Sequence, residues 1–228
     1  MTCEHGGNRV PPRYRPMFRG LKRDLETHLG YDSGALLMAR DLAAAFRAPL
    51  VASTVTRLVV DLNRSIGHPR LYGTSVRGLA REERERILAD HYLPYRTEVE
   101  QVIATKISHG QRVIHVSSHS FTPELHGKVR TADVGLLYDP ARPGEARLGA
   151  TWKAALAYAA PELRVRRNYP YAGTDDGFMP YLRRRFRPRA YVGIEIEMNQ
   201  AIVVGARRRW TALRSAIIES LRVTLTSQ

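Results

Sequence analysis

YVGIEIEMN, residues 191–199, is the segment from which the fold of this chain is most directly inferred. Its apolar and β-branched residues predict a strand. Glu195 and Glu197 alternate, so both carboxylates would point to the same face of that strand. A second apolar run, RVIHVSS at 112–118, also predicts a strand and leads directly into His119. Two predicted strands therefore carry chemically active side chains towards their carboxyl ends.

Helical and extended segments alternate around these two strands. Residues 33–47 are rich in helix formers, with Asp32 or Ser33 placed as N-cap, and the helical stretch 79–108 should be divided or kinked at Pro94. The other expected strands are 49–55, 57–62, 132–139 and a short run at 163–167. One further helix is expected at 149–160. The C-terminal segment is also expected to be helical, because one face of it would carry Trp210, Leu213, Ile217, Leu221 and Leu225. This alternation predicts a single α/β domain over 1–228, with three α/β/α layers and a mixed, mostly parallel sheet.

The composition excludes several classes of protein. Cys3 is the only cysteine, which excludes a disulfide framework and a cysteine-rich zinc module. No apolar run approaches the ~20 residues of a membrane span, and no secretion signal is visible. We therefore expect a cytoplasmic protein without membrane contact. The net charge of +14 favours anionic partners, but the arginines are spread along the chain, which disfavours nucleic-acid binding.

Ligands of such sheets bind beyond the carboxyl ends of the strands. The polar residues expected there are His5, Asp61–Arg64, Ser118–Ser120 and Glu195–Glu197. His5 and His119 could bind zinc if the fold brings them together; the alternative is two hydrogen-bonded structural histidines. His115, inside its strand, is expected to be structural.

The other polar residues also allow two interpretations. Glu197 could transfer a proton or form a salt bridge, whereas Asp61 is expected to be an arginine partner or a brace for its loop. Asn63 and Arg64 could hold a substrate carboxylate or lie in an exposed turn. The sequence has no glycine-rich phosphate loop and no Gly-x-Ser-x-Gly motif, which disfavours nucleotide-binding and serine-hydrolase functions.

Eight segments, in order, resemble the N-formylglutamate amidohydrolase family. They are CEHGGNRVP (3–11), HLGYDSGA (28–35), TRLVVDLNRS (56–65), YLPYR (92–96), SSHSFTP (117–123), HGKVRTADVGLLYDP (126–140), NYPYAGTDDG (168–177) and VGIEIEMNQ (192–200). The family is distantly similar to zinc carboxypeptidases, aspartoacylase and succinylglutamate desuccinylase. The resemblance implies their three-layer α/β fold and one zinc ion.

The resemblance also implies a role for individual residues. His5 and His119 match zinc ligands, and Glu197 matches the carboxylate that acts first as general base and then as general acid. Asn63 and Arg64 match the residues on the substrate carboxylate. Arg57 or Arg130 would then serve a second carboxylate or the developing oxyanion.

The third metal ligand is open at this point. Asn8 stands where the carboxypeptidase motif has a glutamate, and asparagine is a poor zinc ligand. Asp32 and Glu4 are the available carboxylates; Asp32 is favoured, although it competes with its own role as N-cap. We expect a metal-dependent amidohydrolase that uses a metal-activated water on a small anionic N-acyl amino acid or peptide. The alternatives are a non-catalytic basic binding protein and a peptide or cell-wall amidase.

Overall fold

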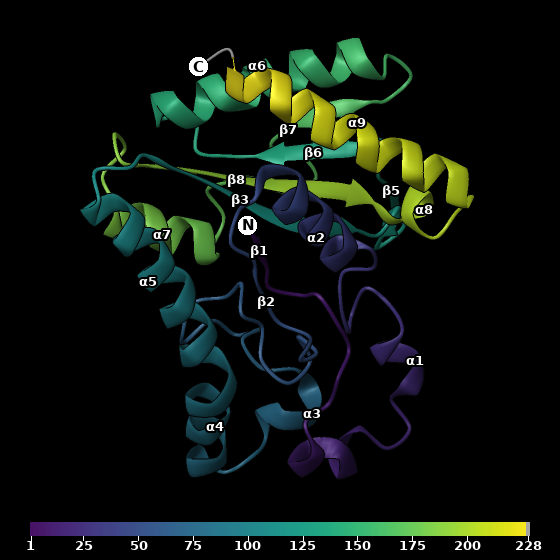
Figure 1. The fold of residues 1–228 in the computed structure, drawn as a ribbon. Helices are drawn as coiled ribbons and strands as arrows, with labels where there is room; N and C mark the ends of the chain where they lie inside the picture. The colour runs from purple at the N-terminus through teal and green to yellow at the C-terminus, as the bar shows by residue number, and fades with distance from the viewer. Residues whose placement is uncertain (227–228) are drawn as a thin grey trace.

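A six-stranded sheet forms the centre of the computed structural model, which describes residues 1–226 (Figure 1). Its strands lie in the order β2-β1-β3-β8-β6-β7, and each neighbouring pair is parallel except β6 with β8. Their bounds are β1 Thr2–Cys3, β2 Val51–Ala52, β3 Val113–Phe121, β6 Val134–Leu137, β7 Val165–Arg167 and β8 Tyr191–Asn199. The prediction of a mixed, mostly parallel sheet is confirmed.

The two central strands, β3 and β8, are paired along their whole length, from Val113 opposite Tyr191 to Phe121 opposite Asn199. Side chains alternate between the two faces of a strand. The even-numbered residues of β8, such as Ile194 and Ile196, pack into one hydrophobic core. The odd-numbered residues, among them Glu195 and Glu197, therefore face the opposite side of the sheet.

Helices cover both faces of the sheet. One core joins the sheet to α2 (Ala35–Phe46), α6 (Pro143–Ala159) and α9 (Arg207–Thr226). A second core contains residues of α5 (Leu93–Ser108) and α7 (Phe178–Arg185). Figure 1 shows α6 and α9 along one side of the sheet and α5 leading away from it towards α4. This is the expected three-layer arrangement.

Shorter elements complete the described chain: η1 Pro12–Phe18, α1 Lys22–Leu25, α3 Thr74–Arg77, α4 Arg81–Ile87, η2 Leu88–Tyr92, β4 Glu124–Leu125, β5 Lys128–Val129 and α8 Gln200–Val203. The stretch 79–108 is divided as expected: a π-helical turn, η2, separates α4 from α5, and Pro94 lies in the first turn of α5. Proline is tolerated there because the first turn of a helix needs no N–H donor.

Residues 57–62 do not form the predicted strand. The main chain makes turns instead: the Val59 N–H donates to the Thr56 carbonyl at 3.0 Å and the Asp61 N–H to the Leu71 carbonyl at 2.8 Å. Val59 and Val60 are buried in the second core. An apolar run signals burial, and these turns bury it without a strand partner.

Other boundaries also differ from the predictions. In the segment 49–55 only β2 is a strand, with one further bridge between Arg9 and Val55. Helix α6 begins at Pro143 instead of residue 149, because the helix continues through both Gly144 and Gly149. Helix α2 begins after Gly34, which has φ 77° and is the N-cap, so neither Asp32 nor Ser33 caps this helix.

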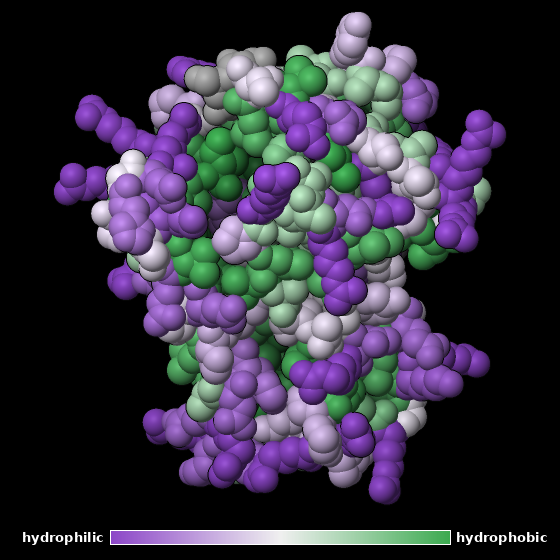
Figure 2. Space-filling model, viewed as in Figure 1, coloured by the Kyte–Doolittle hydropathy of each residue, from purple (hydrophilic) through white to green (hydrophobic). Residues whose placement is uncertain are grey.

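One face of the molecule presents both hydrophilic and apolar side chains. Figure 2 shows hydrophilic side chains projecting around the edge of one face, with apolar side chains gathered across its middle. Within residues 1–226, no helix has the length and apolar character to cross a membrane. The extent of the predicted domain, 1–228, includes two residues outside the described part and stays a prediction.

Candidate functional site

Three predicted site residues, His5, Asp32 and His119, meet at the centre of the molecule. Asp32 Oδ2 lies 3.3 Å from His5 Nδ1 and 2.9 Å from His119 Nδ1. All three side chains are buried, and one ligand atom from each lies within 4.8 Å of the others. Residues far apart in the sequence therefore present two imidazoles and a carboxylate to one another.

Two glycines bring His5 to this place directly after β1. A Cβ on Gly6 would lie 2.8 Å from the Ser53 carbonyl oxygen, and one on Gly7 would lie 2.8 Å from that of Thr54. The chain therefore passes the segment after β2 closely enough for the Gly6 N–H to donate to the Ser53 carbonyl at 2.9 Å. The glycines serve this close approach between backbones.

Each histidine has a second carboxylate on its other nitrogen. His5 Nε2 lies 2.7 Å from Asp61 Oδ1, and His119 Nε2 lies 3.1 Å from Glu4 Oε2. Although burial alone would lower it, the hydrogen bonds with Asp32 and Glu4 raise the pKa of His119 well above its ordinary value. Both rings are thus fixed from two sides.

Glu4 belongs to a buried hydrogen-bond network of its own. The Ser117 hydroxyl donates to Glu4 Oε2 at 2.5 Å and the Tyr95 hydroxyl donates to Glu4 Oε1 at 2.9 Å. Despite its burial, the pKa of Glu4 is lowered by His119 and Ser117. Of the two carboxylates considered for the third ligand, Asp32 lies between the histidines, whereas Glu4 lies on the remote nitrogen of His119.

Glu197 and Glu195 lie beside this cluster on β8. Burial, together with the negative charges of Asp32 and Glu195, raises the pKa of Glu197 to about 8, even though His119 opposes the shift. Glu197 Oε2 is buried and has no hydrogen-bond partner among the described residues. Glu195 Oε2 lies 3.9 Å from His119 Nε2, and burial raises its pKa as well.

Arg57 places a positive charge at the same site. Its Nη2 donates to Asp61 Oδ2 at 2.7 Å, and its Nη1 lies 3.4 Å from Asp32 Oδ1. The interpretation of Asp61 as an arginine partner is confirmed. The Arg57 side chain is 26% exposed, so its guanidinium can reach a ligand as well as the carboxylates of Asp32 and Asp61.

Asn63 and Arg64 hold the loop after Asp61 against the segment before α7. Asn63 Oδ1 accepts from the Phe178 N–H at 2.7 Å, and Arg64 Nη1 donates to the Asp176 carbonyl at 2.7 Å. Ser65 donates to the Asp176 carboxylate. The contact of Asn63 and Arg64 with a substrate carboxylate stays a prediction.

Arg130 packs against two aromatic rings near the site. Its guanidinium carbon is 5.9 Å from the centre of the Phe121 ring and 4.9 Å from that of Tyr171. Phe121 follows His119 by two residues on β3, so both side chains lie on the same face. Arg130 is therefore near the cluster without contacting its carboxylates.

The sequence analysis did not identify Glu4 as the partner of His119, or Tyr95 and Ser117 as the partners of Glu4. Glu4 is adjacent to His5 in the sequence, which was the available signal. Tyr95 comes from α5, and no local pattern links it to the start of the chain. Its contact depends on how α5 packs against the sheet.

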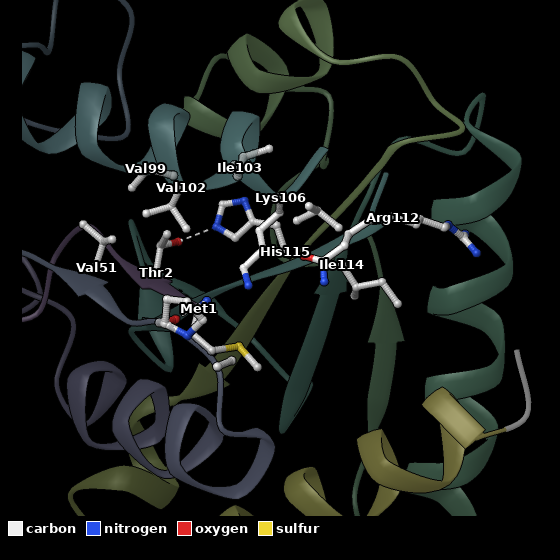
Figure 3. A pocket seen from close by; sticks show the side chains of 14 residues that line it. Met1, Thr2, Val51, Val99, Val102, Ile103, Lys106, Arg112, Ile114 and His115 are labelled. Atoms are coloured by element: carbon white, nitrogen blue, oxygen red, sulfur yellow. Dashed lines mark hydrogen bonds between the residues drawn. The ribbon is translucent and has the colours of Figure 1, made fainter. Parts of the chain in front are cut away.

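A cavity of about 320 Å³ lies elsewhere, at the start of β3 (Figure 3). Val51, Ile103, Lys106 and His115 are among its lining residues. His115 Nε2 is 2.8 Å from the Thr2 hydroxyl and His115 Nδ1 is 2.9 Å from the Tyr191 hydroxyl, so this histidine is structural as predicted. The cavity is distinct from the cluster around His119.

The fold and site together define a class: α/β proteins with a buried histidine–carboxylate centre at one face of a mostly parallel sheet. Within this class, the chain belongs to the N-formylglutamate amidohydrolase family, whose model matches residues 1–204. The predicted family is thus confirmed, and the family supports an amidohydrolase-type function. Among curated proteins, none matches this sequence.

Two solved structures are similar to this chain. The gene product Atu2144 from Agrobacterium tumefaciens is 31% identical with a TM-score of 0.85, over 99% of this chain and 89% of the other. N-formylglutamate amidohydrolase from Ralstonia eutropha JMP134 is 17% identical with a TM-score of 0.70, over 99% of this chain and 92% of the other. At 17% identity, the similarity to the Ralstonia eutropha structure shows that the two proteins share a fold.

Proposed function

We propose that this protein is a metal-dependent amidohydrolase that cleaves an N-acyl amino acid, such as N-formylglutamate, to a carboxylate and a free amine. The observation that carries the proposal is the convergence of His5 Nδ1 and His119 Nδ1 on Asp32 Oδ2. Their buried position beside Glu197 adds the group needed for proton transfer.

The residues present suit zinc. Two imidazoles and one carboxylate are the donor types that catalytic zinc sites use, with a further position left for water or substrate. The remote nitrogens of the histidines are held by Asp61 and Glu4, as in metal sites whose histidines are oriented by carboxylates. His5, Asp32 and His119 would hold the ion, and Asn8, which is exposed, would not take part.

A metal ion bound there would polarise the acyl carbonyl and lower the pKa of a water molecule. Glu197 would accept a proton at Oε2, its unpartnered atom, and deliver it to the departing amine. A bound cation beside Glu197 would favour its ionised form, which is the form that accepts the proton. Arg57 would stabilise negative charge that develops on the acyl oxygen.

Asn63 and Arg64 would bind the α-carboxylate of the substrate. An arginine can offer a carboxylate two parallel N–H donors, and only one contact of the Arg64 guanidinium, to the Asp176 carbonyl, is within hydrogen-bond distance among the described residues. The net charge of +14 favours approach of a small anionic substrate.

A hydrolysis assay with metal analysis tests this function. The protein loaded with zinc should hydrolyse N-formyl-L-glutamate or a related N-acyl amino acid, and removal of the metal with a chelator should abolish the activity until zinc is restored. Full activity in the metal-free protein would contradict metal dependence. Absence of hydrolysis across formyl, acetyl and succinyl amino acids with zinc supplied would contradict the amidohydrolase function.

A further inference from the structure

A second cavity, of about 400 Å³, lies next to the proposed active site. We call it the hairpin pocket, because the β4–β5 hairpin forms one wall and the segment after β7 forms the other. His126 and Gly127 make the tight turn of this hairpin, with φ 50° and 73°. The lining residues are Leu125, His126, Lys128, Val129, Arg130, Tyr169 and Pro170.

The hairpin pocket is basic. His126, Lys128 and Arg130 line it, and no acidic residue does. In the described part of the chain, neither Lys128 nor Arg130 forms an ion pair, whereas Arg57 and Arg183 each do. A pocket with unneutralised cations and no carboxylate is suited to an anionic ligand group.

The pocket is one step along the sheet from the candidate metal centre. Phe121 follows His119 on the same face of β3, about 7 Å further along the strand. The Tyr169 ring meets the Phe121 ring edge-on, with centroids 6.5 Å apart. The Tyr169 carbonyl oxygen lies against Gly135, because a Cβ atom on Gly135 would overlap this oxygen. The same Cβ atom would lie 3.3 Å from Glu197 Cβ. Tyr169, which lines the pocket, thus lies against Gly135, the residue paired with Glu197 across β6 and β8.

Asn63, the proposed partner of the substrate α-carboxylate, is on the opposite side of Glu197. Its side chain lies close enough to Glu195 to lower the pKa of that carboxyl group, and Glu195 precedes Glu197 on the same face of β8. An amide held at the cluster with its amino-acid carboxylate at Asn63 would direct its acyl group the other way, towards Phe121 and the hairpin pocket.

From this arrangement we propose that the hairpin pocket binds a carboxylate at the far end of the acyl group. The inference rests on the proposed amidohydrolase function and goes beyond its formyl example: N-acyl amino acids with a longer acyl chain that ends in an acid are the preferred substrates. Lys128 and Arg130 would pair with that acid, and Leu125 and Pro170 would contact the methylene groups. A formyl group, which is one carbon and one oxygen, would leave most of a 400 Å³ cavity unused.

A comparison of three substrates that share one amine tests this inference: N-acetyl-, N-butyryl- and N-succinyl-L-alanine, with the zinc-loaded protein. Butyryl matches succinyl in chain length but lacks the terminal acid. A hydrogen bond to a charged group is worth enough to give roughly a ten- to hundredfold preference in kcat/KM for succinyl over butyryl. Lys128→Glu should remove most of that preference, with a much smaller loss for butyryl.

Lys106→Glu is the matched control, because it makes the same charge change on the exposed face of α5 at the other end of β3. It should preserve the succinyl preference. Hydrolysis of acetyl- or butyryl-alanine without any preference for succinyl-alanine would overturn this inference alone. Equal losses for succinyl and butyryl in Lys128→Glu would also overturn it. Absence of hydrolysis of all three acyl-alanines, with N-formyl-L-glutamate hydrolysed, would also overturn this inference alone. Absence of hydrolysis of N-formyl-L-glutamate as well would overturn it together with the proposed function.

Discussion

His119 and Glu197 lie directly opposite one another on the neighbouring parallel strands β3 and β8. Opposite residues of paired strands share a face, so the imidazole and the carboxyl group stand side by side in the interior. Ser117 and Glu195 form the preceding pair on that face. The register of two central strands therefore places a candidate metal ligand next to a candidate proton-transfer group.

The first prediction concerns metal content. His5→Ala and His119→Ala should each lower the zinc retained after dialysis by roughly tenfold or more, because each removes one of three ligands. The fold should survive, since the cores on both faces of the sheet do not depend on the metal. Metal analysis and far-UV circular dichroism on the same samples measure both quantities.

His109→Ala is the control for this prediction, as His109 is an exposed histidine at the end of α5. It should retain zinc in full. Asp32→Asn tests the third ligand and should also lose zinc. If His5→Ala and His119→Ala both keep their zinc, the ligand assignment is wrong; if only Asp32→Asn keeps it, the third ligand lies elsewhere.

The second prediction concerns proton transfer. Glu197→Gln keeps the size of the side chain but cannot accept a proton at neutral pH, so kcat should fall by about two to four powers of ten. Metal content should be unchanged. Glu195→Gln is the control from the same face of β8, and it should have a much smaller effect on kcat. Similar, small losses in both variants would remove Glu197 from the mechanism.

The third prediction concerns recognition of the substrate carboxylate. Arg64→Lys keeps the charge but removes the planar pair of donors. KM for an N-acyl amino acid should rise by roughly ten- to a hundredfold, with little change in kcat. Arg70→Lys, an exposed position in the same loop, should leave KM unchanged. Equal KM values for Arg64→Lys and the unmodified protein would show that Arg64 only secures the loop to Asp176.

The parts of the site that sequence could predict are those that depend on strand ends and on strand period. His5 and His119 follow or end strand-like runs, and a period of two puts Glu195 and Glu197 on one face. These inferences needed only that the strands be parallel neighbours in one sheet. The antiparallel pairing of β6 with β8 was beyond this reasoning, because an apolar run of four residues carries no direction.

Other features depend on contacts that no local pattern encodes. Asp32 precedes a helix and therefore fits an N-cap, yet the structure caps the helix with Gly34 and leaves the Asp32 carboxylate to the histidines. Glu4 gains its role from His119, and Tyr95 reaches Glu4 only because α5 packs on the sheet. Such choices between local and tertiary partners are settled by packing.

The last prediction concerns the pH dependence of stability and the buried His115. Burial lowers the pKa of His115 from 6.5 to about 3, because a charged imidazole would lose its hydration in the interior. The folded protein therefore holds the ring neutral. In the unfolded chain the ring takes up a proton as the pH falls below 6.5. Above pH 6.5 the ring is neutral in both states and does not change the free energy of unfolding. Between pH 6.5 and 3 only the unfolded chain binds the proton, so the free energy of unfolding falls progressively. At pH 5 the loss from this residue alone is about 2 kcal/mol.

His115→Gln removes the titrating group and keeps a polar side chain near the hydroxyls of Thr2 and Tyr191. The variant should be less stable than the unmodified protein at pH 7.5, and the gap should narrow as the pH falls to 5. Urea unfolding of the metal-free proteins at both pH values measures the free energies. His109→Gln, at an exposed position, serves as the control and should track the unmodified protein. A gap of constant size at the two pH values would mean that His115 is not held neutral by its burial.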